Sequence, residues 1–436
     1  MSPRDSSPAT AMARETLLEV AVALPVYEVF TYRDLKRAQP LSLGSQVIVP
    51  FGRRTVTGFV VGYAEEPAAE LRGDIRSILE VVGTDPALDE SVLALCRWAA
   101  SYYVAPLGEV LSAALPSGER ASASRRFTLT AAGKAAVCAD GPTGLAAMAL
   151  DAEDRALLVR LKKARTLSLA GIARSSSKGR GRVNFLVEHG FVEISDTVRG
   201  TKRRQMVAGK DAMNADAALP ELPPTLNECQ QTAFSTLMGA LDGAYATFVL
   251  QGITGSGKTE VYLRVIAEVR KRGRGALVMV PEIALTPQLA ARFRARFGDD
   301  VAVLHSALPE GERTAAWRRL RRGEVGIAVG ARSAVFAPVR DLAVVVVDEE
   351  HDGSFKQEDG FRYNARDLAV MRASQSNAIA ILGSATPCLE TCRNIILGRF
   401  TRLLLPIRAN PAAAARPLPP VEILDLRRHP PGPDGL

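Results

Sequence analysis

The sequence has few of the features that mark secreted or membrane-bound chains. No apolar run is long enough to span a membrane, and the polar segment 1–14 does not resemble a signal peptide. Cysteines are rare and scattered, which argues against a disulfide framework and predicts reduced thiols in a cytoplasmic protein. The five cysteines of the 436 residues are Cys96, Cys138, Cys229, Cys388 and Cys392.

A zinc site is also not expected from these cysteines. Cys388 and Cys392 are four residues apart on an expected helix, but no matching second pair accompanies them. The spacing is more typical of a buried helix face.

Positive charge is concentrated in one part of the chain. The formal net charge is +8, and the segment from Gly118 to Lys210 holds 18 Lys/Arg against 8 Asp/Glu. The excess of this segment alone exceeds that of the whole chain. A polyanionic partner is therefore expected to bind there.

Composition and periodicity predict a multidomain α/β protein with several consecutive parts. A disordered arm covers 1–14, and Ala208–Pro224 is rich in Ala, Asp and Pro, as linkers are. The predicted divisions are an arm at 1–14, a β-rich domain at 15–117, a winged-helix domain at 118–208, a linker at 209–224, a P-loop domain at 225–405 and a final segment at 406–436.

The β-rich domain is predicted from short apolar runs punctuated by Pro and Gly. A helix follows at Glu90–Tyr103, where apolar residues recur at i, i+3 and i+4. The expected strands are Leu18–Leu24, Val29–Tyr32, Gln46–Val49 and Thr55–Tyr63.

The basic segment predicts a winged helix. Helices are expected at Asp154–Arg165, Leu167–Ala173 and Ser175–His189, followed by strands at Phe191–Ser195 and Lys202–Val207. In that fold the last helix enters a groove of DNA and the wing contacts the backbone. A solvated basic face or a protein-docking module is the alternative. The predicted DNA contacts are Lys178, Arg180 and Arg182 on the helix, and Arg199, Lys202, Arg203 and Arg204 on the wing.

The segment Phe248–Thr259 predicts a phosphate-binding loop. A short apolar strand breaks into a glycine-rich turn and is followed by a helical run, the context that G-x-x-x-x-G-K-[ST] requires. Backbone N–H groups of the turn would hold a phosphate, Lys258 would neutralise it and Thr259 would hold Mg²⁺. The predicted nucleotide-binding residues are Gly252, Ile253, Thr254, Gly255, Ser256, Gly257, Lys258 and Thr259.

Two further motifs follow expected strands of a doubly wound parallel sheet. Leu342–Val347 is apolar at every position, as a strand covered on both faces should be, and it ends in Asp348 and Glu349. Asp348 would hold Mg²⁺, and Glu349 would polarise the attacking water. In Gly383–Pro387, the hydroxyls of Ser384 and Thr386 would sense the γ-phosphate and relay hydrolysis. A P-loop kinase would leave these two motifs unexplained. The other strands are expected at Thr247–Leu250, Ala276–Val280, Val301–Leu304, Gly326–Val329 and Ala378–Leu382.

These motifs together resemble superfamily-two helicases, and most closely the bacterial PriA family of replication-restart helicases. The resemblance also covers the N-terminal segments Val49–Arg53 and Tyr102–Val110, which are similar to the DNA-end-binding domain of that family. The remaining stretches that carry it are Gly252–Tyr262, Val280–Gln288, Gly330–Phe336, Asp348–Asp352, Tyr363–Asp367 and Gly383–Pro387. Ala331 and Asn364 depart from the family pattern, which has threonine and histidine there.

The resemblance implies further site residues. Gln230 would read adenine, and the aromatic segment Phe355–Tyr363 would couple DNA to ATP, with bases stacking on Phe355 or Phe361. A packed aromatic corner is the alternative for that segment. The cations implied to contact DNA in and near it are Arg332, Lys356 and Arg362.

The N-terminal domain is expected to recognise a DNA 3′ end. Residues 17–116 carry no excess of Lys/Arg, so a pocket for one terminal nucleotide fits better than a general clamp. The turn Pro50–Arg54 offers an aromatic ring and two cations. The alternative is that Phe51 is a core residue and the arginines are solvated.

The resemblance implies an ATP-dependent helicase that couples hydrolysis to 3′-to-5′ unwinding at stalled forks. Its partners would be forked DNA with a 3′ end, single-stranded-DNA-binding protein and other primosome proteins, in a nucleoid-associated location. Val421–Arg427 resembles the entry to a second helicase lobe, and the family's zinc-binding cysteines and arginine fingers would follow beyond Leu436. A DNA-binding platform that does not translocate is therefore the alternative function.

Overall fold

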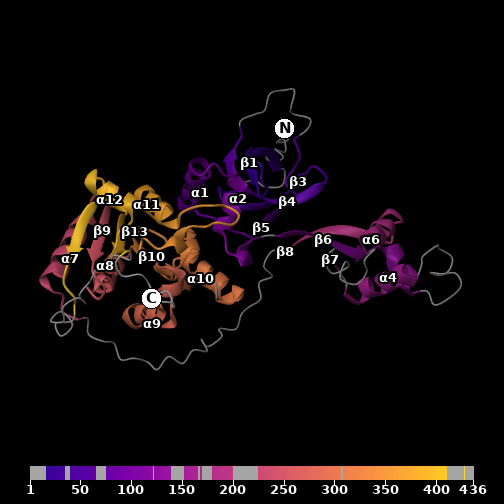
Figure 1. Ribbon diagram of the computed structural model, residues 1–436. Helices are drawn as coiled ribbons and strands as arrows, with labels where there is room; N and C mark the ends of the chain where they lie inside the picture. The colour runs from indigo at the N-terminus through magenta and orange to yellow at the C-terminus, as the bar shows by residue number, and fades with distance from the viewer. Residues whose placement is uncertain are drawn as a thin grey trace, which may run out of the picture.

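The computed structural model describes residues 16–34, 40–64, 75–120, 122–138, 152–164, 167–168, 179–199, 224–305, 308–409 and 427. These residues form three sheets, of five, three and seven strands. We call the parts that carry them the N-terminal domain (16–120), the middle domain (122–199) and the P-loop domain (224–409). Figure 1 shows the N-terminal domain in indigo between the other two. The predicted multidomain α/β class is confirmed.

The N-terminal domain is an antiparallel sheet with the strand order β2-β1-β4-β3-β5. The four predicted strands form within a few residues of their expected ends, and β5 adds a short edge strand that the sequence did not predict. The elements are β1 Thr16–Val22, β2 Phe30–Asp34, β3 Gln46–Phe51, β4 Arg54–Tyr63, β5 Glu80–Val82, α1 Glu90–Tyr102, α2 Leu107–Ala114 and the short 3₁₀ helix η2 Ser117–Glu119.

Helix α1 has the apolar face that its sequence predicts, and a side-chain cap that was not predicted. The Asp89 side chain accepts a hydrogen bond from the backbone N–H of Val92, which satisfies one of the free donors of the first turn. Val92, Leu95 and Ala99 are buried against the domain core. The helix therefore forms locally and is held by one apolar stripe.

The middle domain is a three-stranded antiparallel sheet with the order β7-β6-β8 and its own small core. Leu167–Ser168 is a strand, so the helix predicted at Leu167–Ala173 is wrong at its start, because pairing with Arg126 and Phe127 of β6 overrides local propensity. The second predicted wing strand, Lys202–Val207, lies outside the described residues, and the winged-helix assignment stays a prediction. The elements are β6 Ser122–Leu129, α3 Ala131–Cys138, α4 Ala152–Ala164, β7 Leu167–Ser168, α6 Gly179–Glu188 and β8 Val192–Arg199.

The P-loop domain is a parallel sheet with the order β11-β12-β10-β13-β14-β9-β15 and helices packed against it. All six predicted strands form, and β15 adds an edge strand that was not predicted. The strands are β9 Ala246–Gly252, β10 Gly275–Met279, β11 Val301–Leu304, β12 Ile327–Gly330, β13 Leu342–Asp348, β14 Ile379–Ser384 and β15 Thr401–Leu405. The helices are α7 Glu228–Ala240, α8 Lys258–Lys271, η4 Glu282–Ala284, α9 Pro287–Phe297, α10 Glu310–Arg322, η5 Arg332–Phe336, η6 Gly353–Phe355, α11 Ala365–Gln375 and α12 Leu389–Ile396.

Strand β13 shows why this sheet is predictable from the sequence. Its residues Leu342–Val347 are all buried, because one hydrophobic cluster covers each face of the sheet. A parallel sheet covered on both faces needs such uninterrupted apolar strands. The strand ends at Asp348, and the polar site begins there.

The N-terminal and P-loop domains share one hydrophobic core. Buried side chains of α1 and α2, including Leu95 and Leu111, belong to the same cluster as Phe336 of η5 and Leu368 of α11. Cores of separate domains are normally separate, so this continuous cluster fixes the two domains against each other.

Ion pairs seal one edge of that junction. The buried carboxylate of Glu119 accepts hydrogen bonds from Arg318 of α10 at 2.6 Å and lies 3.5 Å from Arg321 Nη1. Thr314 packs so closely on η2 that a Cβ at Gly118 would lie 2.1 Å from its Oγ1. Within the described parts of the chain, no helix has the length and apolar character needed to cross a membrane.

Candidate functional site

The P-loop, the acidic motif that begins at Asp348 and the hydroxyl segment 383–387 lie close together because the strands that precede them are neighbours. Strands β13, β14 and β9 lie side by side, with Asp348 opposite Gly383 and Ser384 opposite Gln251. The carboxyl ends of parallel strands share one edge of the sheet, where such folds bind nucleotides. The acidic motif, the hydroxyl segment 383–387 and the P-loop therefore face one site.

The P-loop adopts a conformation that glycine makes possible. Gly255 and Gly257 have φ angles of 79° and 81°, in the left-handed region, and Gly257 caps the N-terminus of α8. A Cβ at Gly252 would lie 2.4 Å from Ser256 Oγ, so this position also requires the smallest residue. Ser256 Oγ is buried without a hydrogen-bond partner in the loop. The N-terminus of α8 beside this loop has backbone N–H groups that fit a phosphate.

Lys258 is held between the loop and the acidic motif. Its Nζ donates a hydrogen bond to the carbonyl oxygen of Gly252 at 3.2 Å and lies 3.6 Å from Glu349 Oε1. The side chain is only 9% exposed. The ammonium therefore lies inside the site, where it can neutralise a bound phosphate. Thr259 follows it in the first turn of α8 and is half-buried.

Gln230 uses its amide on the protein itself. Its Oε1 accepts a hydrogen bond from the backbone N–H of Asn227, and its Nε2 donates one to the carbonyl oxygen of Ser256 at 2.9 Å. The predicted adenine-reading residue thus touches the P-loop and also closes the cap of α7. Adenine recognition by this amide stays a prediction.

Asp348 and Glu349 form the acidic end of β13. Burial raises the pKa of the Asp348 carboxyl, and the charge of Glu349 raises it further, whereas Lys258 lowers it. Glu349 has a φ angle of 47°, uncommon for a residue with a side chain. Such strain concentrates at functional sites, where the surrounding structure holds it in place.

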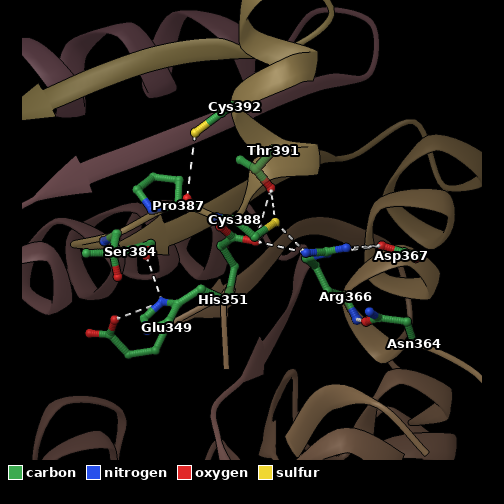
Figure 2. A network of polar contacts seen from close by, with 12 residues as sticks. Glu349, His351, Asn364, Arg366, Asp367, Ser384, Pro387, Cys388, Thr391 and Cys392 are labelled. Atoms are coloured by element: carbon green, nitrogen blue, oxygen red, sulfur yellow. Dashed lines mark hydrogen bonds and ion pairs between the residues drawn. The ribbon is translucent and has the colours of Figure 1, made fainter. Parts of the chain in front are cut away.

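The hydroxyl segment is tied to the acidic motif through His351. The His351 Nδ1 atom lies 2.8 Å from Ser384 Oγ and 3.8 Å from Glu349 Oε2 (Figure 2). Ser384 is fully buried, and its Oγ also accepts a hydrogen bond from the backbone N–H of Thr386. Thr386 itself is exposed. This imidazole contact was not predicted, although His351 is part of the recognised acidic motif.

Glu350 follows Glu349 in the acidic motif, but its side chain is fully buried and binds other parts of the protein. It accepts hydrogen bonds from the Cys388 backbone N–H at 2.8 Å, the Thr391 hydroxyl at 3.0 Å and Arg366 Nη1 at 3.3 Å. Figure 2 shows Arg366 reaching from the start of α11 towards Cys388 and Thr391 of α12. We call these four residues the Glu350 clamp. It joins the acidic motif to the helices that follow the aromatic and hydroxyl segments.

The aromatic segment is packed in the structure. Phe355 is 1% and Phe361 is 7% exposed, so neither ring is open to a base, and the packed-corner alternative describes this conformation. Phe361 stacks on Tyr363 and meets Tyr103 of the N-terminal domain edge-on. Base stacking on these two rings would require the segment to move, and it stays a prediction.

The cations near the aromatic segment fall into two kinds. Arg332 Nη1 donates hydrogen bonds to the carbonyl oxygens of Ser354 and Lys356, and these bonds hold the backbone of the aromatic segment in place. The side chains of Lys356 and Arg362 are exposed. Their exposure leaves these two available to an outside anion.

Most of the predicted basic contacts of the middle domain cannot be placed. Lys178, Lys202, Arg203 and Arg204 lie outside the described residues, and Arg180 is in the first turn of α6. Arg182 pairs with Glu153 at 2.9 Å and with Asp154 at 3.1 Å, so it binds α6 to α4. Its predicted contact with DNA therefore competes with two acids of its own domain.

The turn between β3 and β4 has a mixed character. Phe51 is half-buried and meets Phe30 edge-on with ring centroids 5.1 Å apart, while Arg53 and Arg54 are exposed. The alternative of a core phenylalanine with solvated arginines is thus partly realised. The turn therefore combines an apolar ring with exposed cations.

The donor set fits a magnesium nucleotide. Thr259 and Asp348 provide the hard oxygen ligands that Mg²⁺ prefers, and the P-loop provides N–H donors for phosphates. Within the described ranges, no group of three or more His, Cys, Asp or Glu side chains is placed to hold a metal ion. Cys388 is half-buried in the Glu350 clamp, and Cys392 lies one turn further along α12.

Comparison with protein families assigns two parts of the chain. A model described as a 3′DNA-binding domain (3′BD) matches residues 19–116. A model described as a DEAD/DEAH box helicase matches residues 227–395. The first match falls on the N-terminal domain and the second on the P-loop domain, so the chain combines a DNA-binding domain with a helicase domain.

Curated relatives match nearly the whole chain. The replication restart protein PriA of Haemophilus influenzae is 34% identical over 412 residues, which cover 92% of this chain and 53% of that protein. The replication restart protein PriA of Bacillus subtilis is 32% identical over 448 residues, covering 89% of this chain and 54% of that protein. The chain therefore spans about half the length of the curated relatives it matches.

A solved structure of RecG bound to a three-way DNA junction is also similar. It matches with a TM-score of 0.34 and 22% identity, and the match covers 44% of this chain and 25% of that one.

Proposed function

Because the chain belongs to the PriA family of replication restart proteins, we propose that it binds forked DNA and couples this binding to ATP hydrolysis for unwinding. The observation that carries the proposal is the meeting of P-loop and acidic motif at one sheet edge. Lys258 Nζ lies 3.6 Å from Glu349 Oε1 there, with Asp348 next to it on β13. The residues needed for nucleotide hydrolysis are thus within reach of one bound phosphate chain.

The roles of the residues follow from this geometry. The P-loop N–H groups and Lys258 bind the phosphates, and Glu349 accepts a proton from the attacking water. Thr259 and Asp348 would hold Mg²⁺, which neutralises phosphate charge when it is bound. Ser384, held by His351, is the group through which a change at the phosphate would reach the hydroxyl segment.

The DNA partner is proposed from the 3′DNA-binding domain match and the charge distribution. The N-terminal domain takes a 3′ end, and the basic residues between 178 and 204 contact the phosphate backbone. Exposed Lys356 and Arg362 of the P-loop domain would provide two further cations for DNA phosphates. A fork with a 3′ end, 3′-to-5′ unwinding and assembly with single-stranded-DNA-binding protein and primosome proteins complete the proposal.

A platform that binds DNA without translocating is less well supported. Such a platform has no need of an assembled hydrolytic site, whereas Lys258, Asp348 and Glu349 lie together here. The helicase match over residues 227–395 favours the enzyme as well.

Nucleotide binding by the full chain tests the proposal. Lys258→Ala should abolish binding of a fluorescent ATP analogue in the presence of Mg²⁺, because the buried ammonium is the cation facing the phosphates. Lys271→Ala removes the same charge from the other end of α8, where the side chain is 74% exposed, and should bind as the unmodified chain does. Equal binding by the unmodified chain and Lys258→Ala would refute the assignment of this site.

A further inference from the structure

Tyr262 is a buried polar residue for which the hydrolytic roles above have no use. It lies on α8, four residues after Lys258, so both side chains leave the same face of the helix. The residue is 1% exposed. Its hydroxyl donates a hydrogen bond of 3.3 Å to Asp348 Oδ1.

A glycine opposite Asp348 makes room for this hydroxyl. Gly383 pairs with Asp348 between β14 and β13, and a Cβ at Gly383 would lie 1.5 Å from the Tyr262 Oη atom. Its φ angle is not in the positive region, so its backbone conformation does not require glycine. The reason for glycine at this position is the space that the phenol occupies.

The same hydroxyl helps to fix how the carboxylate is turned. Asp348 Oδ1 accepts hydrogen bonds from the Glu349 backbone N–H at 3.1 Å and from Tyr262. Among the described residues, both hydrogen bonds of the Asp348 side chain end on this oxygen. Oδ2 is consequently the oxygen left for an outside ligand.

We propose that Tyr262 is a positioning residue, which holds Asp348 Oδ1 so that Oδ2 is presented to the Mg²⁺ of the bound nucleotide. The inference rests on the proposed function, because it assigns a partner to the metal ligand of that site. Gly383 is part of the same arrangement, because the absence of a side chain there leaves space for the Tyr262 ring and hydroxyl. Groups that orient a metal ligand in this way commonly contribute about tenfold or more to metal affinity.

The Mg²⁺ dependence of nucleotide binding tests this role. In the full chain, Tyr262→Phe removes one oxygen and should raise the Mg²⁺ concentration for half-maximal binding of a fluorescent ATP analogue about tenfold. Binding in EDTA should stay unchanged, because the phosphate contacts of the P-loop remain. A purely structural role would instead weaken both measurements together.

Tyr245→Phe is the matched control. Its hydroxyl also has one side-chain partner, Thr247 Oγ1 at 2.8 Å, but it lies at the far end of β9 from the P-loop. This variant should keep the Mg²⁺ dependence of the unmodified chain. An unchanged Mg²⁺ dependence in Tyr262→Phe would overturn the inference alone, whereas absence of nucleotide binding in the unmodified chain would overturn the proposed function with it.

A second variant tests the contact with Gly383 independently of metal. Gly383→Ala should lower the melting temperature, since its Cβ would overlap the phenol oxygen. Combining it with Tyr262→Phe removes that oxygen and should restore part of the loss. If the two losses simply add, the glycine does not serve the tyrosine.

Discussion

Tyr103 and Tyr363 place two phenol hydroxyls at the junction of the N-terminal and P-loop domains. Burial raises the pKa of each to about 12. The Tyr103 hydroxyl also accepts a hydrogen bond of 3.1 Å from the backbone N–H of Asn364, at the start of α11. Deprotonation of these hydroxyls should therefore weaken the junction.

Alkaline pH should weaken the fold through these two groups. A tyrosine in the unfolded chain titrates near pH 10, so the folded state binds more protons between about pH 10 and 12. Their contribution is complete below pH 10 and is lost as the pH rises towards 12. Tyr103→Phe should therefore show a shallower fall in melting temperature over this interval, although it melts lower at neutral pH. A fall as steep as that of the unmodified chain would exclude Tyr103 as a source.

At the scale of elements, the Glu350 clamp connects the end of β13 to the starts of α11 and α12. Glu350 follows the end of β13, and its buried carboxylate accepts hydrogen bonds from Arg366 in the first turn of α11 and from Cys388 and Thr391 at the start of α12. The side chains of Glu350 and Arg366 are 0% and 13% exposed. Arg366 also pairs with the partly exposed Asp367 at 3.0 Å, so breaking the pair with Glu350 removes one buried, charge-assisted hydrogen bond and leaves Arg366 one acidic partner.

Glu350→Gln should lower the free energy of unfolding by about 1.5–3 kcal/mol in urea titrations, because Arg366 loses its buried charged partner and keeps Asp367. Arg322→Gln is the comparison, since the exposed pair of Arg322 and Glu324 should contribute less than about 1 kcal/mol. Equal effects of the two substitutions would mean that the Glu350 clamp is as weak as a surface pair.

At the scale of the whole molecule, the docking of the N-terminal domain matters most. The two domains lie side by side in Figure 1. They share a core, and side-chain contacts of Glu119 with Arg318 and of Tyr103 with Asn364 also join them. Tyr103 also touches Phe361 of the aromatic segment. A DNA end bound to the N-terminal domain would thus lie on a body that is fixed to the nucleotide site.

The full chain should distinguish DNA 3′ ends. A duplex with a 3′-hydroxyl overhang should bind about tenfold, or ~1.4 kcal/mol, more tightly than the same duplex with a 3′-phosphate, because the predicted pocket for one terminal nucleotide would exclude the added charged group. The same change made at the 5′ end is the control and should have no effect. Equal affinity for both 3′ ends would leave the N-terminal domain a structural support for the P-loop domain.

The sequence by itself determined the parts of this protein whose physics is local. The glycines of the P-loop, the cap of α1 and the uninterrupted apolar strand β13 follow from a few neighbouring residues. The closeness of Lys258 to Glu349 was predictable too, because parallel strands bring their carboxyl ends to one edge of the sheet.

Only the tertiary structure decided which polar group meets which over long distances in the chain. Burial of Phe361 depends on Tyr103, which lies more than 250 residues earlier, and no local pattern carries that pairing. Tyr262 meets Asp348 only because β14 places Gly383 beside them. Helical spacing from Lys258 could have indicated its direction, but its partner depends on the order of strands in the sheet.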